Sequence, residues 1–116
     1  ATLLRRGASI DLRISSNTAL NGYTALLCAA LNGHERVVEL LLQHGAEVDL
    51  QNIDGETALM SAAFDGRSAV VLQLLRAGAD MALRTVDGHT ALQLAKDEGH
   101  TECVAAVKTF LGEMAA

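Results

Sequence analysis

The chain has 116 residues and a formal net charge of −5, and half of its residues are apolar although only three are aromatic. Nucleic-acid binding usually needs a clustered positive surface, so this acidic balance argues against a nucleic-acid partner and favours a basic or neutral one. No run of about 18 apolar residues occurs, so no membrane-spanning helix is predicted. The apolar residues are mostly Leu, Ala and Val, which favours closely packed helices.

The cysteine content and the lack of a secretion signal predict an intracellular protein, cytoplasmic or nuclear. Cys28 and Cys103 are the only cysteines, too few for a disulfide framework. The sequence shows neither a basic leader before an apolar segment nor an N-x-[ST] site. Free thiols are typical of a reducing compartment.

The first 20 residues read as the end of a repeating unit. The segment "LLRRGASIDL" (3–12) matches "LLQHGAEVDL" (41–50), but no first helix precedes it. The loop that follows carries five more residues than the equivalent loop of the next unit. We therefore expect a partial unit with an extended loop, and a chain that begins inside a repeat of a longer array.

A complete unit follows at residues 21–53. Its Asn-Gly turn at Gly22 accepts a positive φ, and Thr24 is placed to cap a short helix. Gly33 is placed to end that helix, and Gly45 to end a second, more apolar one. The unit is a turn, a short helix, a tight loop and a longer helix.

The same unit returns twice at a constant step, at 54–86 and at 87–116. Thr57-Ala58-Leu59 and Thr90-Ala91-Leu92 repeat the first helix start. In the last unit, lysines stand at two positions that are apolar earlier, 96 and 108, and Ala106 replaces a leucine. We expect a polar outer cap there.

No unit can bury its own apolar surface, because the helix around Val37–Leu42 is apolar on nearly every side. Stacking on the next unit provides the burial. The predicted fold is an all-α solenoid in a single domain, residues 1–116, divided as 1–20, 21–53, 54–86 and 87–116.

Residues 22–49, "GYTALLCAALNGHERVVELLLQHGAEVD", resemble the ankyrin-repeat pattern almost position by position, and the resemblance extends over essentially the whole chain. Three departures stand out. The family's T-P-L-H proline is alanine in every copy, its histidine is Leu27, Met60 or Gln93, and Gln73 replaces a leucine. We expect a softer array, because the usual Thr–His hydrogen bond is missing. Gln73 must be hydrogen-bonded or partly exposed.

The sequence favours no enzyme, no cofactor and no metal site. Units stack at about 8–10 Å, so His34 and His100, two units apart, should lie about 20 Å apart. The same spacing separates the two cysteines, which we expect to be buried. We expect His34 and His100 to bond loop carbonyls, and His44 to lie at a helix end.

The resemblance implies a protein-interaction module that binds on a concave side, through loop tips and short helices. The residues carried over combine large apolar side chains with acidic ones, which suits a protein or peptide bearing Lys or Arg beside an apolar anchor. We expect no membrane partner and a monomer as an isolated domain. The alternative is a structural spacer or self-association segment of a larger protein. The candidate partner-binding residues are Tyr23, Leu31, Asn32, Ile53, Asp54, Glu56, Phe64, Asp65, Val86, Asp87, His89, Asp97 and Glu98.

Overall fold

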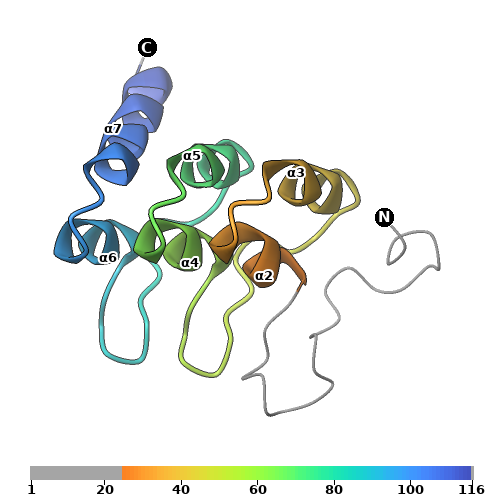
Figure 1. Ribbon diagram of the computed structural model, residues 1–116, viewed down its shortest axis with the longest axis horizontal. Coiled ribbons are helices and arrows are strands. Elements are labelled where there is room, and N and C mark those ends of the chain that lie inside the picture. The colour runs from red at the N-terminus through yellow and green to blue at the C-terminus, as the bar shows by residue number, and fades with distance from the viewer. Residues whose placement is uncertain (1–24, 116) are drawn as a thin grey trace.

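The helices stack in two parallel rows joined by projecting loops (Figure 1). The structure, a computed structural model, describes residues 25–115. Short helices form one row and longer helices the other, and the loops that join successive pairs project beyond the short row. The described residues contain helices and no strand, which confirms the predicted all-α solenoid. The helices are α2 (Ala25–Leu31), α3 (Glu35–Gln43), α4 (Ala58–Phe64), α5 (Ser68–Arg76), α6 (Ala91–Asp97) and α7 (Thr101–Ala115).

Threonine caps begin two of the short helices, as the sequence predicts. Thr57 Oγ1 accepts from the Met60 N–H at 3.2 Å, and Thr90 Oγ1 accepts from the Gln93 N–H at 3.3 Å. In return, the Thr90 N–H donates to Gln93 Oε1 at 2.9 Å, and the Thr57 N–H lies 3.4 Å from the Met60 sulfur. Gln93 and Met60 stand at the family's histidine position, so these residues themselves supply bracing at the caps. Thr24 lies outside the described residues.

Each short helix ends at a glycine in the left-handed region, as predicted. The φ angles are +73° at Gly33, +75° at Gly66 and +74° at Gly99. After Gly66, the Arg67 N–H donates to the Ala62 carbonyl at 2.8 Å, and the other two loops repeat this bond. An L side chain at this φ is strained, which explains the recurrent glycine.

The core runs between the two rows. Alanines of the short helices are fully buried, including Ala30 and Ala62, so these helices can approach one another closely. In α3, Val38 and Leu41 are buried but Val37 is 39% exposed, so only one side of this apolar helix is covered in the described structure. The remaining fully buried large side chains come from both rows and include Leu26, Leu59, Met60, Val71, Leu74 and Leu75.

The two cysteines are free thiols in different surroundings. Cys103 is buried as expected, whereas Cys28 is only half-buried, so the expectation of burial is wrong for Cys28. Burial raises the pKa of both thiols, and the nearby Glu102 carboxylate raises that of Cys103 further. Both side chains are therefore poor nucleophiles at neutral pH.

Hydrogen bonds to helix-end carbonyls join one unit to the next. Arg67 Nε donates to the Leu31 carbonyl at 3.1 Å, and His100 Nε2 donates to the Phe64 carbonyl at 2.9 Å. Arg67 and His100 hold equivalent positions in successive units, as do the residues of the two carbonyls. The predicted role of His100 is thus confirmed, and Arg67 performs it one unit earlier. His44 Nδ1 donates to the Leu40 carbonyl at 2.8 Å, at the end of α3.

Candidate functional site

Two projecting loops, which we call the fingers, are shaped by polar side chains at their bases. They comprise residues 51–56 and 84–89. In the first finger the buried Asn52 Oδ1 accepts from the Asp54 N–H at 2.9 Å and from the Glu56 N–H at 3.0 Å. Asn52 Nδ2 also donates to Glu56 Oε1 at 2.8 Å. In the second finger Thr85 Oγ1 accepts from the His89 N–H at 3.2 Å.

The two fingers are held side by side by backbone contacts. The Val86 N–H of the second finger donates to the Asp54 carbonyl of the first at 2.9 Å. Gln51 Nε2 lies 3.2 Å from the Arg84 carbonyl. A Cβ added at Gly55, where φ is +79°, would lie 3.0 Å from the Val86 nitrogen. The fingers are thus fixed relative to one another before any partner arrives.

A hollow of about 360 Å³ opens between the fingers and the short helices. Phe64 lines this hollow and is 47% exposed. It is one of two phenylalanines in the chain. The hollow joins residues of both fingers, α4 and α6, and six of the predicted partner-binding residues line it together: Asp54, Glu56, Phe64, Val86, Asp87 and His89.

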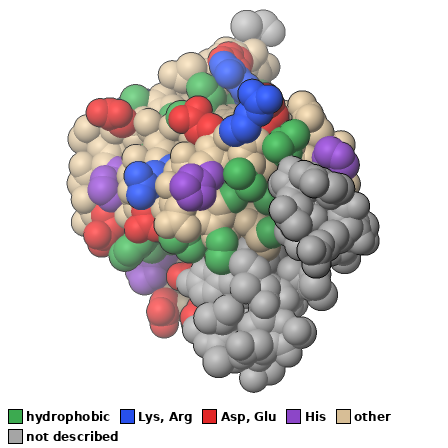
Figure 2. Space-filling view, turned by 45° about the vertical axis from the view of Figure 1, so that its right-hand side comes forward, with side chains coloured by type: hydrophobic (Ala, Val, Ile, Leu, Met, Phe, Trp, Pro, Cys, Tyr) green, Lys and Arg blue, Asp and Glu red, His purple; other side chains and the backbone are tan. Residues whose placement is uncertain are grey.

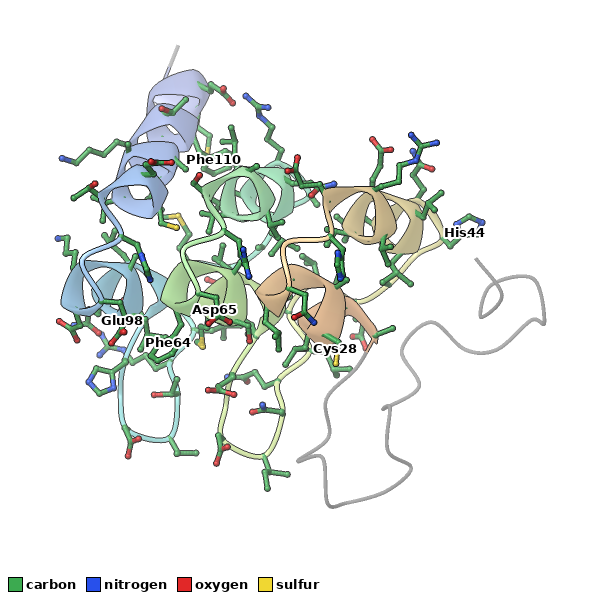
Figure 3. All side chains as sticks on the ribbon, in the orientation of Figure 1. Cys28, His44, Phe64, Asp65, Glu98 and Phe110 are labelled. Atoms are coloured by element: carbon green, nitrogen blue, oxygen red, sulfur yellow. The ribbon has the colours of Figure 1, made fainter. Side chains whose placement is uncertain are left out.

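The other candidates do not line this hollow. Ile53 lies at a finger tip with 68% of its surface exposed. Leu31 and Asn32 end α2, where the Asn32 Nδ2 donates to the Cys28 carbonyl at 2.9 Å. Tyr23 lies outside the described residues. The remaining three candidates are exposed residues at the ends of α4 and α6: Asp65, Asp97 and Glu98. Figure 3 labels Asp65 and Glu98 beside Phe64.

Three residues that the sequence did not predict as partner-binding also line the hollow: Met60, Thr85 and Leu94. Met60 stands at the family's histidine position, and a thioether there is suited to an apolar wall. Leu94 holds the position that Ser61 holds in the preceding unit, so an apolar side chain replaces a polar one. This change from a polar to an apolar residue at equivalent positions is the sequence signal that could have identified Leu94 as a lining residue.

The surface around the hollow combines apolar and acidic side chains. Asp54, Glu56 and Asp87 bring carboxylates from both fingers, and His89 adds an imidazole ring to the lining. In Figure 2, acidic and hydrophobic side chains lie next to one another at the lower left. We call this surface, made by the two fingers and the ends of α4 and α6, the finger face.

Within residues 25–115 no three His, Cys, Asp or Glu side chains are grouped as metal ligands. No helix in the described part of the chain is long and apolar enough to cross a membrane.

Stacked helix pairs joined by a row of projecting fingers define a helical repeat protein. A model of the family "Ankyrin repeats (3 copies)" matches residues 2–85, and the chain belongs to the ankyrin-repeat family. Ankyrin repeats are generally protein–protein interaction modules, and the family is generally non-enzymatic. A search of curated proteins found no significant match. The final helix pair, α6 and α7, lies beyond the matched range but continues the same stack.

Proposed function

We propose that this chain binds a partner protein or peptide at the finger face. The observation that carries the proposal is the shared hollow, which joins side chains from two fingers and two short helices around an exposed phenylalanine. Large exposed apolar side chains cost little in a monomer when scattered, but a cluster beside a hollow is typical of an interaction site. Phe64 and Val86 form such a cluster, with 47% and 71% of their surfaces exposed.

The chemistry of the hollow favours a partner segment with Lys or Arg next to an apolar anchor. The exposed Phe64 ring can pack against an apolar side chain or an aliphatic stem. Asp54 and Asp87 can attract the cationic head, and a guanidinium over the Phe64 ring would add cation–π attraction. Nucleic acid is disfavoured because the same carboxylates would repel phosphates.

Selection of peptides on the full chain tests this assignment. A displayed random-peptide library should yield binders whose affinity falls by about 10- to 30-fold in Phe64→Ala, because aromatic anchors dominate such interfaces. The double variant Tyr23→Ala, Phe64→Ala should lose more. Val37→Ala is the matched control, since Val37 is an exposed apolar residue on α3.

The outcome depends on which variant loses binding. Loss in Phe64→Ala with retention in Val37→Ala supports the finger face. Equal affinity of wild type and Phe64→Ala would place the binding elsewhere and overturn the assignment. Light scattering of the free chain gives the accompanying check, because we expect a monomer.

We also infer an intracellular location. The thiols of Cys28 and Cys103 are both free, as a reducing compartment maintains them. Fluorescent tagging of the full-length protein tests this inference, and a secreted product with oxidised cysteines would contradict it.

A further inference from the structure

The helix pair α6 and α7 forms one end of the described stack (Figure 1). A hollow of about 380 Å³ lies between these helices, lined mainly by apolar surface. Val104, Lys108 and Leu111 follow one another at helical spacing along α7, and Leu111 is 46% exposed. We call this surface the end face; its lining residues are Ala95, Lys96, Gly99, His100, Thr101, Val104, Ala105 and Lys108.

The same surface one unit earlier shows what covers it inside the molecule. Ala63, Val71 and Leu75 hold the positions that Lys96, Val104 and Lys108 hold in the last unit. All three are at most 2% exposed, where α6 packs on α4 and α7 packs on α5. Inside the stack, therefore, helices seat against this surface. The end face repeats that backbone shape, and no helix of residues 25–115 covers it.

Two glycines show the difference between the covered and the open surface directly. A Cβ at Gly66 would lie 2.9 Å from the His100 ring, whereas a Cβ at Gly99 would meet no atom within 4 Å. Both glycines end a short helix with nearly the same φ, +75° and +74°. The space that His100 occupies in the internal contact is thus open at the end face.

The end face differs from the internal surface in charge. Lys96 replaces Ala63 and Lys108 replaces Leu75, and both lysines are exposed. No Asp or Glu is among the residues that line the end face. A wholly apolar helix seated here would bury the ammonium groups unpaired, which is costly. A helix with carboxylates beside its apolar stripe would instead pair them.

A solvated cap accounts for the two lysines but leaves the apolar residues of α7 unexplained. Leu111 remains 46% exposed and Met114 68% exposed. Helix α7 is also 15 residues long, against 9 for α3 and for α5, so it offers a longer groove wall. Water alone favours neither feature, whereas a docked helix would use both.

We propose that the end face binds an amphipathic helix of a partner protein, with Glu or Asp residues flanking an apolar stripe. The apolar stripe lies against Val104, Ala105 and Leu111, and the carboxylates meet Lys96 and Lys108. This second surface is independent of the finger face and takes a ligand of opposite charge. The chain can therefore hold two partners at once.

A helix library displayed against the full chain tests the proposal. The probes are alanine-based helices of about 18 residues with one randomised face, long enough to form stable turns. Enriched probes should carry Glu or Asp beside Leu or Ile at positions i, i+4 and i+7. The double reversal Lys96→Glu, Lys108→Glu should weaken them by about tenfold or more, because two attractions become repulsions. Added salt should weaken binding to the wild type.

Matched variants make each outcome decisive. Lys96→Arg, Lys108→Arg should retain binding, and Phe64→Ala should leave it unchanged because Phe64 belongs to the finger face. Both lysines are exposed, so we expect the reversal variant to fold normally. An unchanged melting temperature checks this. The proposal is overturned if no enriched helix depends on the two lysines. It is also overturned if the double reversal abolishes self-association of the free chain, since the occupant is then a second copy.

Discussion

The internal contact between the units 54–86 and 87–115 and the end face of the second unit share one backbone design and differ in side chains. Inside, Ala63 and Leu75 are buried beneath α6 and α7. At the end face, Lys96 and Lys108 stand at the same places and remain exposed. Threonine caps begin both short helices, and Gly66 and Gly99 end them with nearly the same φ. The side chains at the positions of Lys96 and Lys108 distinguish the covered surface from the open one.

The difference teaches that two side chains change the chemistry of a helical surface without a change of fold. Repeat proteins gain stability from contacts between neighbours, so an apolar end would attract a further unit or another chain. Charged residues at the end prevent unspecific stacking because burying them unpaired costs free energy. They also favour a partner whose surface carries the opposite charge, since such a surface pairs them.

The largest expected effect comes from adding one methyl group to the covered surface and to the open one. Gly66→Ala should lower the free energy of unfolding by about 2–4 kcal/mol: left-handed strain of about 1–2 kcal/mol, plus displacement of His100 and loss of its hydrogen bond. Gly99→Ala carries only the strain, about 1–2 kcal/mol, because nothing lies near its added Cβ. Urea denaturation of both variants measures the difference.

Equal losses of stability in Gly66→Ala and Gly99→Ala would contradict the comparison of the covered and open surfaces. The methyl group at position 66 would then not be opposed by the His100 ring. His100→Ala provides the control. In that background Gly66→Ala should cost about as much as Gly99→Ala does in the wild type, since the ring that the methyl group displaces is gone.

The sequence predicted the fold because its signals are local. Thr57 accepts the bond that begins α4, and Gly66 ends it with the predicted positive φ. The constant repeat spacing then ordered the units. The resemblance to ankyrin repeats placed Phe64 and Val86 on the finger face, and the structure brings them to one hollow.

The remaining features depended on distances between units, which no local pattern encodes. The inclusion of Met60 and Leu94 in the hollow follows from the approach of the fingers, fixed by the Val86–Asp54 backbone bond. Bracing by Gln93 depends on the rotamer that returns its amide oxygen to the Thr90 N–H.

A polar residue within an internal contact gives the second prediction. Gln73 Nε2 donates to the Glu35 carbonyl at 2.9 Å, but its Oε1 is buried without a hydrogen-bond partner. Gln73→Leu should therefore raise the free energy of unfolding by about 1 kcal/mol and raise the melting temperature, because the uncompensated acceptor is removed. Glu35 lies in a helix, so its carbonyl has a backbone partner as well.

Thermal denaturation measures the effect, and Gln73→Met is the control that keeps an unbranched side chain without the amide. Both variants should gain stability. A clear fall in both would show that the bond to Glu35 outweighs the buried acceptor. Internal contacts would then tolerate polar residues better than the comparison with the end face implies.

The smallest expected effect concerns the ion pair that joins the last helix to the preceding unit. Arg76 donates to the Glu113 carboxylate, and this hydrogen bond lowers the pKa of Glu113. A carboxyl whose pKa is lowered by folding stabilises the folded state above its unfolded pKa, and this contribution is lost as pH falls through the folded pKa. Both side chains are well exposed, so the gain is small.

Glu113→Gln should therefore lower the melting temperature slightly at neutral pH and leave it equal to wild type in acid, below the pKa of the bonded carboxyl. Melting curves of both proteins across this pH range measure the convergence. If the difference in melting temperature between Glu113→Gln and the wild type persisted in acid, Glu113 would act through packing of the last turns of α7 rather than through charge. These turns would then be fixed to the stack independently of pH, and the exposed Leu111 would be presented to a partner at any pH.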